Sequence, residues 1–250
     1  MRRIELPGDE DLPYDTSLPL EGLLPAAVLF DMDGLLIDSE PIWTVAEHEI
    51  AGELGGEFTP LIKASMIGQA LSTAVPLLLT GLDTPAARAA DPAEVGRRLL
   101  TRMAELFADE LPLQPGARDL LELTRFHGIP MALVSSSYRL LVDAALNVLG
   151  KDTFDATVAG DEVTATKPAP DPYLIAAEQL GVDPHLCLVL EDSMAGVESA
   201  LAAGCRCILV PTFSPDVIPE GVDVHPTLER VDLIGLIHVM GRFRSSEDAP

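Results

Sequence analysis

Short apolar runs alternate with helical patterns along most of the chain. Five runs have the length of strands that are buried on both faces, and they lie at residues 26–30, 130–134, 156–159, 186–190 and 206–210. In five other segments apolar residues recur at helical spacing, and these are residues 116–126, 138–149, 172–180, 193–203 and 227–238. Strands that alternate with helices are typical of the α/β class, so we predict a doubly wound, mostly parallel, Rossmann-like sheet.

One connection breaks this alternation. Residues 41–113, between the first and second predicted strands, carry helical patterns only, among them 41–54 and 92–110. A connection of this length is too long for a loop, so we predict a small α-helical cap domain inserted into a discontinuous core of residues 26–40 and 114–244. The insertion begins at the carboxyl end of the first strand, where open α/β sheets bind their ligands.

The two ends of the chain lack both patterns. Residues 1–25 are acidic and rich in proline, which predicts an extended N-terminal arm. Residues 245–250 are polar and predict a disordered tail.

The overall composition excludes several classes of partner. The chain has 250 residues, 48% of them hydrophobic, and a formal net charge of -24. Such a charge repels nucleic acids and anionic membrane surfaces, so we expect neither as a partner. Three cysteines cannot all pair, which favours a reducing compartment, and the sequence contains neither a signal-peptide core nor an apolar stretch of membrane length. We therefore expect a cytoplasmic globular protein; its oligomeric state is left open.

Polar residues stand directly after three of the predicted strands: Asp31 and Asp33, then Ser135 to Ser137, then Glu191 and Asp192. The carboxyl ends of parallel strands meet at one edge of a sheet, so we expect these side chains to converge there with Lys167 from a proline-rich loop. Crowded carboxylates repel one another unless a cation lies among them, and oxygen ligands favour Mg²⁺. Mg²⁺ and a lysine would attract a small phosphorylated metabolite, which predicts a phosphoryl-transfer site.

The spacing of Asp31 and Asp33 suggests divided roles for the pair. Residues two apart in an extended chain point in the same direction, so one carboxylate can attack phosphorus while the other handles the proton of the leaving group. Gly34 would let the backbone approach the phosphate closely. The hydroxyl of Ser135 and the backbone amide of Ser136 can donate hydrogen bonds to it.

These residue types also have purely structural interpretations. Aspartate and serine favour turns and helix N-caps, and we adopt that interpretation for Asp38 and Ser39. The serine run alone could be an ordinary loop, and Lys167 alone a surface lysine. Their occurrence together with two acidic pairs, each at a strand end, favours the chemical interpretation.

Four stretches in order resemble the motifs of the haloacid dehalogenase-like hydrolases, in particular the branch of beta-phosphoglucomutase and the sugar-phosphate phosphatases. They are DMDGLL at 31–36, VSSS at 134–137, KPAPDPY at 167–173 and LEDSMAG at 190–196, and the resemblance extends over residues 26–240. It implies that Asp31 is the nucleophile of an aspartyl-phosphate intermediate and that Asp33 is the general acid and base. It also implies that Ser135 binds the transferring phosphoryl group and that Lys167 holds this group against the nucleophile.

The resemblance further implies a Mg²⁺ site. Its ligands would be the carboxylates of Asp31 and Asp192 and the backbone carbonyl of Asp33. Glu191 would be either a direct ligand or a residue that contacts one.

Two positions differ from the mutases of this branch. The mutase arginine that grips a second phosphate would align near Leu71, and the histidine after the first motif at Trp43. Because loss of a cationic anchor favours release and attack by water, we predict a Mg²⁺-dependent phosphatase for a small sugar or polyol phosphate, with a mutase as the alternative. Glu40 and Gln69, near the predicted hinge of the cap, are candidate substrate-binding residues.

Three alternatives come from other functional classes. A phosphoacceptor receiver domain uses the same residue types but lacks an inserted cap. A catalytically idle interaction module would not need the intact acidic and lysine set. A nucleotide-dependent oxidoreductase is disfavoured because no GxGxxG pattern follows the first strand.

Overall fold

The structure is a computed structural model that describes residues 24–212 and 217–241. The predicted tail therefore lies outside the described residues, as does nearly all of the predicted N-terminal arm. The described part of the chain contains one sheet of six strands in the order β3-β2-β1-β4-β5-β6, and every neighbouring pair is parallel. The strands are β1 (Ala27–Phe30), β2 (Met131–Val134), β3 (Ala156–Val158), β4 (Cys187–Glu191), β5 (Arg206–Leu209) and β6 (Asp223–Val224).

The predicted α/β class and parallel sheet are confirmed, and five of the six strands coincide with the predicted apolar runs. All residues of β1, β2 and β4 are buried, as expected for strands that are covered on both faces. The sixth strand, β6, was not predicted. Its two residues are only partly buried or exposed, so no apolar run marks it.

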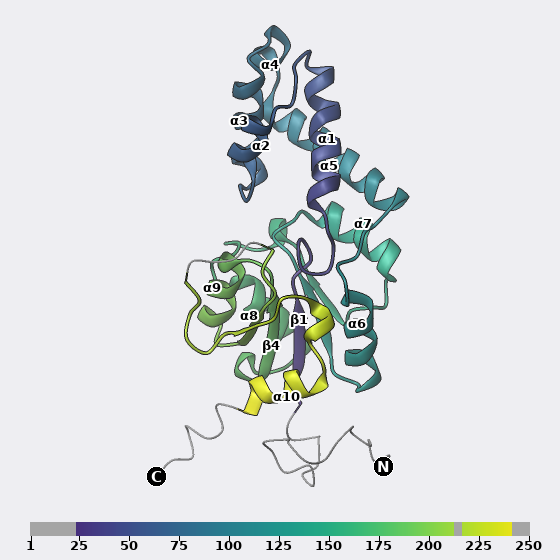
Figure 1. The fold of residues 1–250 in the computed structure, drawn as a ribbon, viewed down its shortest axis with the longest axis vertical. Helices are drawn as coiled ribbons and strands as arrows, with labels where there is room; N and C mark the ends of the chain where they lie inside the picture. The colour runs from purple at the N-terminus through teal and green to yellow at the C-terminus, as the bar shows by residue number, and fades with distance from the viewer. Residues whose placement is uncertain (1–23, 213–216, 242–250) are drawn as a thin grey trace.

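Helices cover both faces of the sheet (Figure 1). Successive residues of a strand point to opposite faces, so Val28 and Phe30 pack in one hydrophobic cluster and Ala27 and Leu29 in the other. The first cluster includes side chains of α6 (Ala117–Phe126), α7 (Arg139–Leu149) and α10 (Leu233–Gly241). The second includes side chains of α8 (Asp171–Leu180) and α9 (Met194–Ala202).

The helix predicted at residues 227–238 is wrong in its bounds. A short 3₁₀ turn at Leu228–Arg230 comes first, and α10 begins only at Leu233. Asp232 accepts a hydrogen bond from the backbone amide of Gly235 at 2.8 Å, which is the contact of a helix N-cap. A capping residue in the middle of the apolar pattern thus divides it into two elements.

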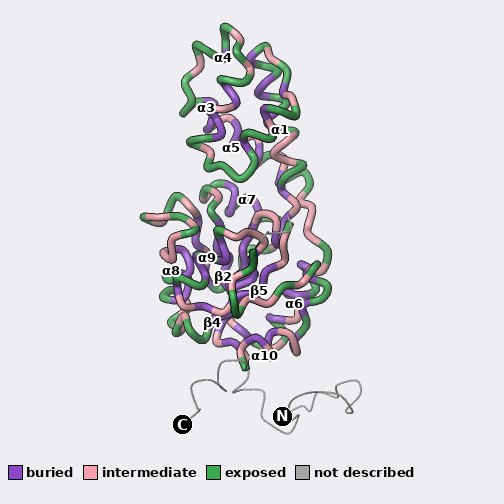
Figure 2. Tube along the Cα trace, turned by 60° about the vertical axis from the view of Figure 1, so that its left-hand side comes forward, coloured by how far each residue is buried: buried purple, intermediate pink, exposed green. Residues whose placement is uncertain are grey.

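Five helices lie between β1 and α6, and we call them together the helical insert. They are α1 (Glu40–Glu53), α2 (Pro60–Met66), α3 (Leu71–Leu82), α4 (Pro85–Ala89) and α5 (Pro92–Asp109). The insert lies beyond the carboxyl end of β1, at the opposite end of the molecule from α10 (Figure 1). Figure 2 shows buried residues both inside the insert and around the sheet. The domain boundaries at residues 40/41 and 113/114 stay a prediction.

Threonine and aspartate side chains begin several helices of the insert. Thr59, Thr84 and Asp91 each accept a hydrogen bond from a backbone amide in the first turn of the helix that follows, and a proline comes next in each case. Ser39 occupies the same position before α1 but makes no capping hydrogen bond, so its predicted capping role is wrong. Its backbone is already helical, with φ -80° and ψ -18°, whereas a capping side chain needs an extended backbone. No helix in the described ranges is both long and apolar enough to cross a bilayer.

Candidate active site

The predicted strand-end residues meet beneath the helical insert. Strand β1 has β2 on one side and β4 on the other, so the order in which the strands are added to the sheet reverses at β1. The crevice at such a reversal is where α/β folds bind ligands. A cavity of about 1000 Å³ lies there, lined by residues of the core and of the insert. The predicted site residues that line it are Asp31, Asp33, Gly34, Glu40, Gln69, Ser136, Lys167 and Asp192.

Lys167 is the ionic centre of the core side of this cavity. Its Nζ lies 2.5 Å from Asp31 Oδ1 and 2.6 Å from Glu191 Oε1, and it donates a hydrogen bond to the carbonyl of Val134 at 2.9 Å. The side chain is only 4% exposed. Burial alone would lower the pKa of Lys167, but attraction to the two carboxylates outweighs it and raises the pKa above its usual value. The ammonium group therefore stays charged.

Asp31 lies in a strongly negative environment. Burial raises the pKa of its carboxyl well above the usual range, Lys167 opposes this rise, and the charges of Glu191, Asp192 and Asp33 add to it. The ionised form of Asp31 thus depends on positive charge beside it. Lys167 supplies one such charge, and the crowding of acids leaves an electrostatic demand for another.

Asp33 is held by two serines. Its Oδ2 accepts hydrogen bonds from the hydroxyls of Ser135 at 3.2 Å and Ser137 at 2.8 Å. Its Oδ1 is buried and has no hydrogen-bond partner within the described residues. A buried oxygen without a partner is costly in a folded protein, so this atom is available to a ligand. Ser137 belongs to the predicted serine run, but its contact with Asp33 was not foreseen.

The acidic residues could hold a metal ion. Asp31, Glu191 and Asp192 each offer one carboxylate oxygen, and these atoms all lie within 4.8 Å of one another. Oxygen atoms at this separation suit a hard divalent cation.

Glu191 differs from the other two acids because its oxygens are already hydrogen-bonded. Oε1 accepts from Lys167 and from the hydroxyl of Tyr173 at 2.6 Å. Oε2 accepts from the amides of Asp192 and Ser193 and from the Ser193 hydroxyl. A carboxylate has about four acceptor positions, so Glu191 has none to spare and is suited to orienting its neighbours. Burial, followed by the charge of Glu191, raises the pKa of Tyr173, so its hydroxyl stays a donor.

Asp192 is more accessible and better suited to bind an ion directly. Its Oδ2 accepts a hydrogen bond from the hydroxyl of Thr212 at 2.7 Å. Burial and the charge of Glu191 raise the pKa of Asp192 to about 6. Thr212 was missed in the sequence, although it follows a predicted strand at residues 206–210 and could have been found by the same rule as the other strand-end residues.

Two glycines make space for these acids. A Cβ on Gly34 would lie 2.1 Å from Asp192 Oδ2, and its φ of +88° is unfavourable for other residues. A Cβ on Gly196 would lie 1.8 Å from the carboxyl carbon of Glu191. Close approach of Gly34 to phosphate stays a prediction, but the structure shows that a glycine is needed here for the position of Asp192.

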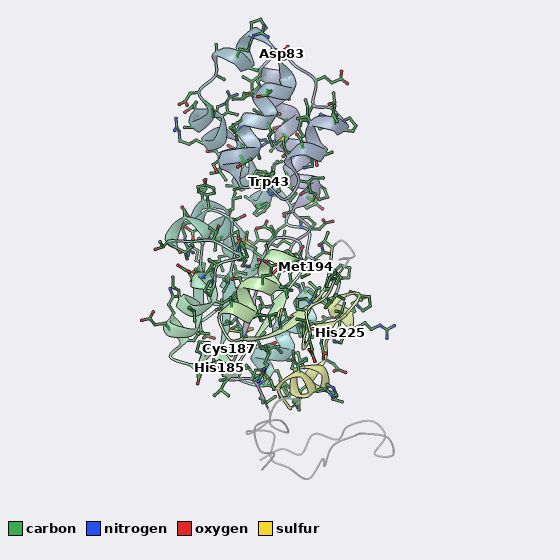
Figure 3. The ribbon with its side chains drawn as sticks, turned by 90° about the vertical axis from the view of Figure 1, so that its left-hand side faces the viewer. Trp43, Asp83, His185, Cys187, Met194 and His225 are labelled. Atoms are coloured by element: carbon green, nitrogen blue, oxygen red, sulfur yellow. The ribbon has the colours of Figure 1, made fainter. Side chains whose placement is uncertain are left out.

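The insert side of the cavity carries a second ionic group, which the sequence did not reveal. Lys63 on α2 lies 2.7 Å from Glu40 Oε1 and 2.8 Å from Glu47 Oε2, both on α1. Burial raises the pKa of Glu47, and the hydrogen bond from Lys63 partly lowers it again. Gln69 is exposed, and no hydrogen bond of its side chain is seen among the described residues. Figure 3 shows Trp43 at the end of the insert nearest the core.

Known proteins resemble the chain in sequence and in structure. The family model described as haloacid dehalogenase-like hydrolase matches residues 25–204. Hexitol phosphatase B of Escherichia coli is 34% identical over 190 residues, which cover 74% of this chain and 83% of that protein. Fructose-1-phosphate phosphatase YqaB of Escherichia coli is 34% identical over 189 residues, covering 73% and 95%.

Solved structures of CbbY from Rhodobacter sphaeroides share the fold. The complex with phosphate has a TM-score of 0.74 and 29% identity and covers 85% of this chain and 99% of its own. A variant in complex with xylulose-(1,5)bisphosphate has a TM-score of 0.73 and 27% identity over the same shares of the two chains.

Proposed function

This chain belongs to the haloacid dehalogenase-like hydrolases, and we propose that it is a phosphatase that hydrolyses a small sugar or polyol phosphate through an aspartyl-phosphate intermediate. One observation carries the proposal: Asp31, Asp33 and Lys167 line a single cavity, with Lys167 Nζ 2.5 Å from Asp31 Oδ1. The names of the relatives support the substrate class, since one acts on hexitol phosphates and another on fructose 1-phosphate.

Asp31 and Asp33 divide the chemistry in two steps. A carboxylate oxygen of Asp31 attacks phosphorus, and the bond between phosphorus and the substrate oxygen breaks as Asp33 gives that oxygen a proton. The alcohol leaves and the phosphoryl group stays on Asp31. Asp33 then takes a proton from water, the water oxygen attacks phosphorus, and phosphate is released with Asp31 restored. The serines that hold Asp33 Oδ2 leave Oδ1 free for the proton.

Lys167 and the backbone provide the electrostatic setting. Lys167 remains charged and lies against Asp31, so it can draw the phosphoryl oxygens toward the nucleophile. The carboxylates of Asp31 and Asp192 and the backbone carbonyl of Asp33 would hold Mg²⁺, with Glu191 orienting Lys167 and the chain at Asp192. When bound, Mg²⁺ would neutralise negative charge on the phosphoryl group.

The cavity wall disfavours the mutase alternative. A mutase must hold a second phosphate while the first is exchanged. At the positions where mutases of this branch carry an arginine and a histidine, this chain has Leu71 and Trp43, which line the cavity and carry no charge. Among the described lining residues the only basic side chains are Lys63 and Lys167, and each already contacts two carboxylates.

Release of phosphate from a panel of phosphomonoesters with Mg²⁺ tests the proposal. The panel contains hexitol phosphates, ketose 1-phosphates and p-nitrophenyl phosphate. Asp31→Asn is expected to lower kcat on the order of 10⁴-fold or more, since the amide is a poor nucleophile. The matched control is Asp143→Asn, an exposed acid on α7, which should retain wild-type rates. Comparable turnover by Asp31→Asn would remove the nucleophile, and a requirement for a bisphosphate activator would indicate a mutase.

A further inference from the structure

The ionic group on the insert side of the cavity is the starting point, and we call Glu40, Glu47 and Lys63 the insert cluster. All three residues line the cavity that also contains Asp31. Lys63 lies 2.7 Å from Glu40 and 2.8 Å from Glu47, so two negative charges lie beside its one positive charge. The side chain of Lys63 is 17% exposed and that of Glu47 7%, whereas Glu40 is 51% exposed and reachable from the cavity.

The charge of the insert cluster limits what can bind opposite the catalytic aspartates. Two carboxylates and one ammonium sum to a net charge of about -1, before the acids of the core are counted. A second phosphate or a carboxylate at the far end of a substrate would meet this negative charge, and Lys63 could reach it only by leaving its partners. Hydroxyl groups, in contrast, donate hydrogen bonds readily to carboxylate oxygens.

On the basis of the proposed function, we propose that the insert cluster is a specificity site for the leaving-group end of the substrate, and that it selects an uncharged polyhydroxyl end over one that carries a second anionic group. Glu40 would accept hydrogen bonds from the hydroxyls directly. Lys63 and the buried Glu47 would hold Glu40 in position. Apolar residues of the insert that line the cavity, among them Trp43 and Leu71, add apolar surface without a competing cation.

A purely structural role is the alternative outcome. The cluster joins α1 to α2, so it could serve only to stabilise the helical insert. In that case its loss would lower the melting temperature and reduce the rates for all substrates by one common factor. A specificity site predicts a change in the ratio between substrates.

The test compares kcat/KM of the full chain for glucitol 6-phosphate, xylulose 1,5-bisphosphate and p-nitrophenyl phosphate. The double variant Glu40→Gln with Glu47→Gln reverses the cluster charge, because Lys63 keeps its ammonium. We expect kcat/KM to fall about tenfold for the hexitol phosphate and to rise about tenfold for the bisphosphate. The value for p-nitrophenyl phosphate, which has neither hydroxyls nor a second charge, should change less than either. Glu40→Gln alone should also raise kcat/KM for the bisphosphate relative to that for the hexitol phosphate. Glu40 is half-exposed, so this single variant can be tested even if the double variant does not fold.

The matched control is Glu49→Gln with Glu53→Gln on the same helix. Both residues are exposed and paired with arginines of α5, so the chain loses the same charge outside the cavity. The control should leave the ratio of bisphosphate to monophosphate hydrolysis unchanged. Equal shifts in the control, or no shift in the cluster variants, would overturn the specificity site. Failure of the wild type to hydrolyse any of the three esters would instead overturn the proposed phosphatase function.

Discussion

The cavity has a lysine between two carboxylates on each of its two sides. In the core, Lys167 lies 2.5 Å from Asp31 and 2.6 Å from Glu191. In the insert, Lys63 lies 2.7 Å from Glu40 and 2.8 Å from Glu47. The local geometry is thus nearly the same. The surroundings differ, because the core lysine is 4% exposed and the insert lysine 17%.

The difference shows how one arrangement can serve two purposes. The core cluster contains two further acids, Asp33 and Asp192, so four carboxylates face one lysine. This surplus of negative charge in a largely buried site favours the binding of a cation. The insert cluster has only its own two acids and is partly exposed, which makes it suited to contact a substrate without taking part in its chemistry. We therefore expect chemistry and selectivity to be separable by mutation.

Loss of the core lysine is expected to have the largest effect. Lys167→Met leaves Asp31 and Glu191 buried without their partner, which should lower the free energy of unfolding by about 3–5 kcal/mol. Loss of the charge beside Asp31, the proposed nucleophile, should also lower kcat by about 10²- to 10³-fold. Chemical denaturation and initial rates measure the two effects. Lys63→Met is the matched comparison and should be milder in both. Equal destabilisation by the two variants would show that the deeper burial of Lys167 does not make its ion pairs more important for stability than those of Lys63.

Gly34→Ala is expected to damage the core site specifically. The new methyl group would displace Asp192, so the apparent affinity for Mg²⁺ should fall by about 10- to 100-fold. Gly55→Ala in the insert is the control, because its φ of +74° brings similar backbone strain but nothing lies within 4 Å of the added carbon. Magnesium titrations of activity compare the two. A loss of Mg²⁺ affinity in both variants would mean that backbone strain, not the position of Asp192, is responsible.

Tyr173→Phe should have a smaller effect on the same site. It removes one of the donors to Glu191 Oε1 but leaves Lys167 in place. We expect the Mg²⁺ concentration at half-maximal activity to rise about tenfold, since residues that orient metal ligands contribute about this much. Unchanged magnesium dependence would indicate that Glu191 needs no help from Tyr173 to position its neighbours.

The outer surface of the insert should be the least sensitive. Arg102 on α5 contacts Glu49 on α1 and Glu105, and all three side chains are substantially exposed. Such surface pairs contribute little, so Arg102→Ala should leave kcat/KM within about twofold of the wild type and the melting temperature nearly unchanged. A large loss of activity would show that the outer face of the insert affects events in the cavity.

Local sequence patterns predict structure correctly where they are tied directly to position in the fold. The runs at residues 26–30 and 186–190 became central strands because continuous apolar sequence must be buried on both faces. Residues at the ends of such strands then had to meet, because all the strands are parallel. Neither β6 nor the start of α10 is marked by such a pattern, because β6 is only partly buried and a capping aspartate precedes α10.

The fold class, the helical insertion after the first strand and the convergence of the strand-end acids with Lys167 all follow from local patterns in the amino-acid sequence. Other features emerge only once the chain is folded: Lys63 is held between Glu40 and Glu47, Ser137 and Thr212 contact the acids, and Glu191 has no free acceptor position. Strand ends are brought together by the regular geometry of a sheet, whereas the partner of a lysine on a short helix depends on how two helices pack, which sequence spacing alone does not encode.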